Sequence, residues 1–160
     1  MAIIRKIVHL ASLICYVFIG IYLVVSIPSL FGYKPLVVLT GSMEPTLKVG
    51  SIIYYKSVSK EDIKQGDIIT FDLNGNYVTH RVNRIENNYY YTKGDYNNTE
   101  DPFKVTYMDI KGKVLGITIP FMGYYIRFIS ENMYLLVFVI LLLVLEFFLT
   151  NSKSNEGKRY

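Results

Sequence analysis

The sequence predicts a mainly β protein, in which a small coiled β-barrel or sandwich is flanked by two transmembrane helices. Three observations support this fold class: long apolar stretches lie near both ends, short apolar runs fill the region between them, and turn-forming residues separate those runs. The expected parts are a cytoplasmic N-terminus with a transmembrane anchor over residues 1–30, an extracytoplasmic β-rich domain over 31–132, a second transmembrane helix over 133–150 and a cytoplasmic tail over 151–160.

The first apolar stretch, Ile7–Ile27, carries no formal charge. As a helix that rises 1.5 Å per residue it is long enough to cross a hydrocarbon core of about 30 Å. The apolar run is too long for the core of a cleavable leader, and no small-x-small cleavage motif follows it. We therefore expect this segment to remain as an anchor.

The second apolar stretch, Met133–Thr150, is shorter and is interrupted by Glu146. Basic residues lie outside both stretches: Arg5 and Lys6 before the first, and Lys153, Lys158 and Arg159 after the second. Because loops rich in Lys and Arg favour the cytoplasmic side, both ends are expected in the cytoplasm. The chain is thus expected to be a multi-pass protein of the cell membrane, with the intervening segment outside.

Short runs with the alternation or β-branched composition of strands occupy the intervening segment. Along Tyr77–Ile85, Val78, His80 and Val82 share one face of the expected strand. The pair Asn74-Gly75 between two such runs is a strong hairpin signal. The other expected strands are Leu36–Leu39, Ser51–Tyr55, Asp67–Phe71, Tyr89–Thr92 and Lys113–Ile119, and Met122–Glu131 is the one expected short helix.

Composition excludes several kinds of chemistry. The single cysteine, Cys15, lies inside the first apolar stretch, so it forms no disulfide within the chain and supplies no external thiolate. One histidine and no cysteine between the apolar stretches argue against a metal site, and no cofactor is expected. The net charge of +4 is too diffuse to indicate nucleic-acid binding.

Ser42 stands out in the turn VVLTGSMEPTLKVG, directly after Gly41. A serine hydroxyl becomes a nucleophile when a neighbouring base takes its proton, and an imidazole does this near neutral pH. His80 is the one imidazole between the apolar stretches. From the strand context alone, a core histidine with a satisfied hydrogen bond is the favoured interpretation of His80, and an ordinary turn remains open for Ser42.

A base also needs an acceptor that orients it, usually a carboxylate. The segment KGDYNNTEDP offers Asp95, Glu100 and Asp101. A lysine is the rival base in serine hydrolases that desolvate an amine, and Lys56 and Lys93 are its candidates.

Four motifs occur in order and together resemble the conserved boxes of one family. They are GSMEPTL (41–47), GDIITF (66–71), THRV (79–82) and TKGDYNNTED (92–101). This set is similar to that of type I signal peptidases of the archaeal and endoplasmic-reticulum type, which also occur in some Gram-positive bacteria. The resemblance covers about residues 36–120, and apolar flanks suit a membrane-anchored member.

The resemblance implies a membrane-bound serine endopeptidase that removes N-terminal signal peptides from exported preproteins. It assigns Ser42 as nucleophile, His80 as general base, Asp101 as the orienting acid and Asp95 as a second support. Tyr96 departs from the family pattern, because relatives often carry a small polar residue there. The partners implied are preproteins with signal peptides and the lipid bilayer; partner subunits in the membrane are left open.

Further roles follow from this mechanism. The backbone N–H of Ser42 and the hydroxyl of Thr40 are the expected oxyanion donors, and Gly41 gives a substrate backbone room to approach. Shallow apolar pockets are expected to hold the small residues of the signal peptide, in a groove that takes the segment as an added strand. Their expected wall residues are Val38, Met43 and Leu47.

Two alternatives accompany this interpretation. One is a relative of the Ser-Lys self-cleaving or repressor-type peptidases, against which His80 and the apolar flanks argue. The other is a non-catalytic, membrane-anchored β domain that acts as a scaffold.

Overall fold

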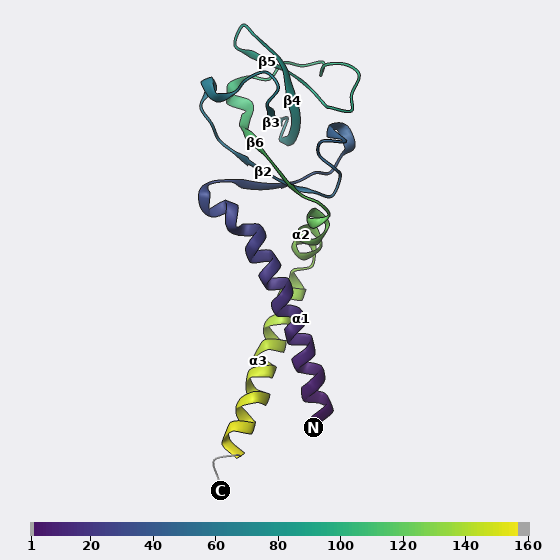
Figure 1. The fold of residues 1–160 in the computed structure, drawn as a ribbon, viewed down its shortest axis with the longest axis vertical. Helices are drawn as coiled ribbons and strands as arrows, with labels where there is room; N and C mark the ends of the chain where they lie inside the picture. The colour runs from purple at the N-terminus through teal and green to yellow at the C-terminus, as the bar shows by residue number, and fades with distance from the viewer. Residues whose placement is uncertain (1, 157–160) are drawn as a thin grey trace. The chain divides into compact units, whose positions relative to one another are not determined.

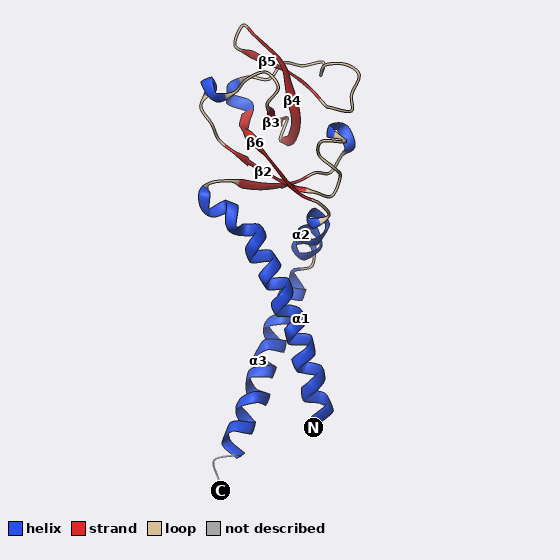
Figure 2. Cartoon of the chain, viewed as in Figure 1, coloured by secondary structure: helices blue, strands red, loops and turns tan. Residues whose placement is uncertain are grey.

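The computed structural model describes residues 2–156 and divides the chain into two compact units. Of the described residues, those up to Val25 and from Ile126 to Glu156 form the first unit, and Ser26–Tyr125 forms the second. Figure 2 shows that helices make up most of the first unit and that the strands belong to the second.

The long helices of the first unit are α1 (Ala2–Ser26) and α3 (Met133–Glu156). Among the described residues, α1 is the one helix long and apolar enough to cross a membrane. The apolar part of α3 is Val137–Leu149, which at 1.5 Å per residue reaches only about 20 Å. The expectation of a second transmembrane helix over 133–150 is therefore corrected, because the apolar part of α3 is shorter than the hydrocarbon core of about 30 Å.

Glu146 of α3 is paired with side chains of α1. His9 Nδ1 lies 2.9 Å from one carboxylate oxygen, and the Tyr16 hydroxyl donates to the other at 3.2 Å. His9 and Tyr16 are seven residues apart and thus share one face of their helix. A carboxylate in an apolar helix is costly unless it is paired, and these contacts supply the pairing.

The second unit is built on a six-stranded antiparallel sheet in the order β1-β2-β6-β3-β4-β5 (Figure 1). The strands are β1 (Lys34–Val37), β2 (Ile52–Lys56), β3 (Ile68–Leu73), β4 (Asn76–Glu86), β5 (Tyr89–Lys93) and β6 (Ile110–Ile119). All six expected strands are confirmed, with shifted ends. The helix α2 (Met122–Glu131) follows β6 at the expected position.

The expected closure into a barrel is wrong, because the sheet is open. Among the described strands, β1 pairs only with β2 and β5 only with β4, so the two edges of the sheet do not meet. Closing a barrel would require these two edges to bond to one another.

The β3–β4 hairpin fixes the register of the strand that carries His80. Asn74 and Gly75 adopt positive φ angles of 54° and 84°, as the mirror-image turns of tight hairpins require. The resulting register places His80 opposite Ile69. As the alternation predicted, His80 and Val82 are buried on one face of β4. Asn83, which lies on the opposite face of the same strand, is exposed.

Two hydrophobic clusters stabilise the sheet. The first has Phe71 and Val82 at its centre, and the Phe71 ring lies 6.5 Å from the His80 ring in an edge-on arrangement. The second contains Met43 and Leu47 from the segment after β1, packed on Ile53 of β2. The first cluster therefore packs against His80, and the second contains Met43, the residue after Ser42.

Candidate active site

Ser42 lies in a short 3-10 helix, η2 (Gly41–Met43), that follows β1. Its neighbour Met43 is 2 % exposed and belongs to the core, so the turn cannot swing freely. The Leu47 N–H donates to the Met43 carbonyl at 2.9 Å and closes the segment after the serine. The hydroxyl of Ser42 is thus presented from a rigid turn, while the side chain stays partly exposed.

The structure brings Ser42, His80 and Asp101 into one hydrogen-bonded chain. Ser42 Oγ lies 3.0 Å from His80 Nε2, and His80 Nδ1 lies 2.6 Å from Asp101 Oδ2. With Asp101 ionised, Nδ1 carries the proton and donates, which leaves Nε2 free to accept from the serine hydroxyl. The His80 and Asp101 side chains are 10 % and 8 % exposed, so water competes little for these bonds.

Asp101 is held in place by Thr92 of β5. The Thr92 hydroxyl donates to Asp101 Oδ2 at 2.7 Å, and the Asp101 N–H donates to the Thr92 carbonyl at 2.9 Å. Thr92 is fully buried. Sequence reasoning missed Thr92, although it is the first residue of the fourth motif.

Asp95 does not touch the imidazole in the described contacts but binds the residue after it. Arg81 Nε and Nη2 donate to its two carboxylate oxygens at 2.8 and 2.6 Å. The Thr46 hydroxyl donates to Asp95 Oδ2 at 2.6 Å. Asp95 therefore ties β4 to the segment that follows Ser42, and the hydrogen bonds from Arg81 lower its pKa. Sequence reasoning missed Arg81 and Thr46; the signal was the position of Arg81 directly beside His80.

The loop after β5 contacts the peptide backbone of Ser42. The Tyr96 N–H donates to the Ser42 carbonyl at 2.9 Å. A Cβ on Gly94 would lie 2.5 Å from the same carbonyl oxygen, which explains the glycine there. Tyr96, the residue that departs from the family pattern, is 74 % exposed, so the larger side chain at this position is accommodated in solvent.

The remaining candidates lie elsewhere. Glu100 accepts hydrogen bonds from Asn83 and Arg84 and forms part of a surface network. The ammonium of Lys56 lies 5.0 Å from the centre of the Tyr33 ring, and the backbone of Lys93 lies opposite that of Arg81 in the β4–β5 ladder. Within the described part of the chain, the base that contacts the Ser42 hydroxyl is an imidazole.

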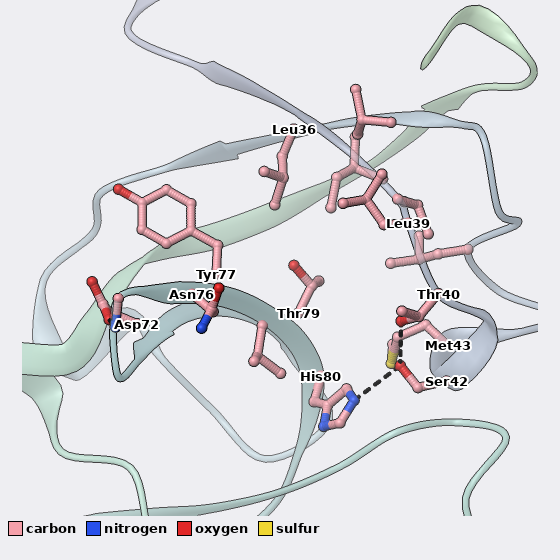
Figure 3. Close-up of a pocket in the computed structure, with 16 residues that line it drawn as sticks. Leu36, Leu39, Thr40, Ser42, Met43, Asp72, Asn76, Tyr77, Thr79 and His80 are labelled. Atoms are coloured by element: carbon pink, nitrogen blue, oxygen red, sulfur yellow. Dashed lines mark hydrogen bonds between the residues drawn. The ribbon is translucent and has the colours of Figure 1, made fainter. Parts of the chain in front are cut away.

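A groove of about 640 Å³ leads away from Ser42 and His80. One side is the segment 36–40, and the other is the beginning of β4, residues 76–80 (Figure 3). The expected wall residues Val38, Met43 and Leu47 line it, whereas Gly41, which was expected to leave room for a substrate backbone, is not among the lining residues. The lining that sequence reasoning missed is mostly Leu36, Leu39, Ile53, Asp72, Asn76, Tyr77, Val78 and Thr79.

Both sides of the groove present free strand edges. In the segment 36–40, Leu36 and Val37 pair with β2 on one side. On the same side, the Val38 N–H donates to the Ser51 carbonyl and the Val38 carbonyl accepts from the Gly50 N–H. On the other side, β5 pairs with β4 only from Arg81 onward, which leaves the same edge of residues 76–80 without a strand partner among the described residues. A peptide in extended conformation fits such a slot, because each edge offers unpaired backbone donors and acceptors.

Replacing Asp95 by asparagine is expected to lower the free energy of unfolding by about 1–3 kcal/mol, because Arg81 and Thr46 lose a shared acceptor. The pKa of this carboxyl is lowered in the folded state. Its contribution is therefore complete above the unfolded value of about 3.9 and is lost as the pH falls through the lower folded value.

Thermal unfolding of the full chain in detergent, followed by circular dichroism, checks this. The difference between parent and Asp95→Asn should be constant from about pH 5 to 8 and shrink only below about pH 4. Glu131→Gln, which removes an exposed partner of Arg127, is the control and should change little. A difference that disappears near neutral pH would contradict the assignment.

Comparisons with known proteins identify the family and several relatives of this chain. The family model described as "Signal peptidase, peptidase S26" matches residues 10–98. "Signal peptidase I W" of Bacillus subtilis (strain 168) is 35% identical over 99 residues, which are 58% of this chain and 52% of that protein. The "Signal peptidase complex catalytic subunit SEC11" of Lodderomyces elongisporus is 35% identical over 111 residues, 61% of this chain and 66% of that protein.

The protein of the same name in Scheffersomyces stipitis is 33% identical over 128 residues, 72% of this chain and 76% of that protein. The chain spans about half the length of the Bacillus protein and 66% of the Lodderomyces one. The family model covers more than half of the sequence and includes Ser42, His80 and Asp95, and the four motifs lie within or directly beside it. The chain belongs to the signal peptidase family, peptidase S26.

Proposed function

We propose that this chain is a membrane-anchored serine endopeptidase that removes N-terminal signal peptides from exported preproteins. The observation that carries the proposal is the hydrogen-bonded chain from Ser42 through His80 to Asp101 at the end of an open groove. A scaffold domain would have no need for a buried imidazole aligned on a serine hydroxyl. The Ser-Lys alternative has less support, because His80 Nε2 lies 3.0 Å from Ser42 Oγ and the Lys56 ammonium lies over the Tyr33 ring.

The first chemical step is the attack of Ser42 Oγ on the carbonyl carbon of the scissile peptide bond. His80 Nε2 takes the hydroxyl proton as the C–O bond forms, and Asp101 stabilises the resulting imidazolium. The imidazolium then gives its proton to the leaving amine as the C–N bond breaks. In the second step, a water molecule loses a proton to His80 and attacks the acyl carbonyl carbon. The ester C–O bond then breaks, His80 returns the proton to Ser42 Oγ, and the signal peptide leaves with a free carboxyl group.

The negative charge on the carbonyl oxygen needs donors where it develops. The Ser42 N–H belongs to the first turn of η2, where N–H groups have no acceptor within the helix. The Thr40 hydroxyl lies 3.5 Å from Ser42 Oγ (Figure 3), and Thr40 is exposed and lines the groove. These two groups form the proposed oxyanion hole.

Thr40→Val is expected to lower kcat by about 10²- to 10³-fold, because it removes one oxyanion donor and keeps the shape of the side chain. Thr40→Ser keeps the hydroxyl and should retain most of the activity. Steady-state cleavage of a peptide substrate by both variants gives the comparison. Equal rates for the two variants would remove Thr40 from the oxyanion hole.

Asp101→Asn is expected to lower kcat by about 10⁴-fold, because the amide no longer fixes the imidazole tautomer that accepts the serine proton. Thr92→Val, which takes away the second donor to the same oxygen, should have a much smaller effect. Cleavage assays at several pH values measure both. Near-parental activity of Asp101→Asn would assign the orienting role to another acid.

The groove suits the end of a signal peptide. A segment between residues 36–40 and 76–80 would add a strand to both free edges, which places backbone hydrogen bonds on two sides. Leu36, Val38 and Val78 line the groove and leave shallow apolar space for small side chains. We therefore expect a preference for small residues at positions −1 and −3 before the cleaved bond.

The proposed location follows from α1, which is long and apolar enough to anchor the chain. Signal peptides are cleaved where they leave the bilayer, so the sheet unit is proposed to lie on the extracytoplasmic side. Two of the relatives are named as catalytic subunits of a complex. Co-purification from the native membrane would test whether this chain also works with other subunits.

The proposed activity is tested with the full chain in detergent and a secreted precursor whose signal peptide ends in Ala-x-Ala. Mass spectrometry of the products should show a single cut directly after the last alanine. A matched precursor with phenylalanine at −1 should remain intact. Cutting of both precursors at unrelated positions, or of neither, would contradict the proposal.

A further inference from the structure

One carboxylate lies among the described residues that line the groove, and it is far from the catalytic group. Figure 3 shows Asp72, Asn76 and Tyr77 at one end of the groove and Ser42 with His80 at the other. We infer that these three residues form a subsite for a basic side chain of the substrate, a lysine or arginine located four to six residues before the cleaved bond. This inference rests on the proposed function and adds a charge preference to it.

Strand geometry sets the position of the basic side chain. A strand rises about 3.3 Å per residue, so Tyr77 lies about 10 Å along β4 from His80. An extended substrate with residue −1 beside His80 brings residue −4 beside Tyr77 and residue −5 beside Asn76. A long lysine or arginine side chain at −4, −5 or −6 then reaches Asp72, which pairs with Tyr77 across the hairpin.

The Asp72 carboxylate retains capacity for another partner. One oxygen accepts the Gly75 N–H at 2.8 Å, within the hairpin turn. The other oxygen lies 3.5 Å from Lys111 Nζ, a loose contact between side chains that are 31 % and 34 % exposed. An ion pair of this kind contributes little, and a carboxylate oxygen accepts more than one donor. A substrate cation can thus join or replace Lys111.

Tyr77 adds a second feature that favours a cation. Its side chain is 51 % exposed, and it meets the Tyr55 ring edge-on with centroids 6.4 Å apart. An exposed aromatic face beside a carboxylate attracts lysine and, more strongly, arginine. The Asn76 side-chain amide, at the same end of the groove, is exposed and offers an acceptor oxygen. Acidic, aromatic and amide groups together form a site for a basic side chain.

The test compares matched precursors that carry Lys, Gln or Glu at position −5 and are otherwise identical. With the parent protein, kcat/KM should be about fivefold higher for Lys than for Glu, as expected of a partly exposed ion pair, and the ratio should shrink in high salt. Asp72→Asn retains the acceptor for the Gly75 N–H and should bring the ratio close to one. Asp72→Lys should invert it.

Glu86→Gln is the matched control, because it removes one negative charge from a carboxylate that pairs with Arg84 outside the groove. This variant should keep the parental ratio. If Asp72→Asn and Glu86→Gln change the Lys-to-Glu ratio of kcat/KM equally, the effect comes from net charge and the subsite is overturned. An unchanged ratio in Asp72→Asn would also overturn it.

The two proposals fail in different ways. If the neutral Gln precursor is not cleaved by the parent, the proposed peptidase activity fails. If that precursor is cleaved correctly by the parent and by Asp72→Asn at the same rate, while the charged precursors are not distinguished, only the subsite fails.

Discussion

Ser42→Ala is expected to reduce kcat for signal-peptide cleavage by about 10⁶-fold, because the variant lacks the atom that attacks the peptide carbonyl. The remaining activity would come from substrate binding and the oxyanion donors alone. Cleavage of an Ala-x-Ala precursor by purified protein, followed by mass spectrometry, measures the loss.

The fold of Ser42→Ala should be unchanged. The substitution keeps the backbone carbonyl that accepts from Tyr96 and leaves Met43 in the core. Its circular dichroism spectrum and thermal midpoint in detergent should therefore match those of the parent. If Ser42→Ala cleaves as well as the parent, the chain is not a serine peptidase.

His80→Ala is expected to reduce kcat by a similar factor of about 10⁶, because no other group then takes the serine proton. Lys56→Ala and Lys93→Ala serve as matched controls, since they remove the candidate bases of the Ser-Lys alternative. Both controls should stay within a fewfold of the parent. Activity retained in His80→Ala and lost in Lys93→Ala would reverse the assignment of the base.

Because His80 is buried, its truncation also leaves a cavity and lowers stability. Two measurements separate chemistry from folding. The first is the thermal midpoint of His80→Ala beside that of His80→Gln, which fills more of the space. The second is rescue by added imidazole, which should restore part of the activity of His80→Ala if the ring acts as a base.

The strands were predictable from the sequence because their signals are local. Alternation placed His80 and Val82 on the buried face of β4, and Asn74-Gly75 marked the β3–β4 hairpin. Closure of the sheet was not predictable in this way. Whether β1 meets β5 depends on strand twist and on pairings between residues far apart in the chain, and no local pattern records them.

The helix α3 also shows what could not be predicted from local patterns in the sequence. Its composition is apolar, but its apolar part, Val137–Leu149, is shorter than the hydrocarbon core of a bilayer. The sequence showed Glu146 as an interruption and did not show its partners. His9 and Tyr16 become its neighbours only once α1 and α3 meet.

At the candidate site, the sequence identified the groups with a chemical signature and missed those that hold them. Ser42, His80, Asp95 and Asp101 stood in recognisable motifs, and the structure brings the first two and Asp101 together. Arg81, Thr46 and Thr92 have common residue types with many ordinary uses. Their roles depend on strand register and loop path, which bring them to Asp95 and Asp101.

The hydrogen bond from the Tyr96 N–H to the Ser42 carbonyl should allow the Ser42 oxygen to be replaced by sulfur without disturbing the turn. A peptide group is common to all amino acids, so the loop that begins at Gly94 holds position 42 without regard to its side chain. Ser42→Cys should therefore keep the turn intact and present a thiol to the same imidazole. With Cys15, the chain's own thiol, replaced by serine, an alkylating reagent then counts the correctly assembled sites in a preparation, independently of any cleavage reaction.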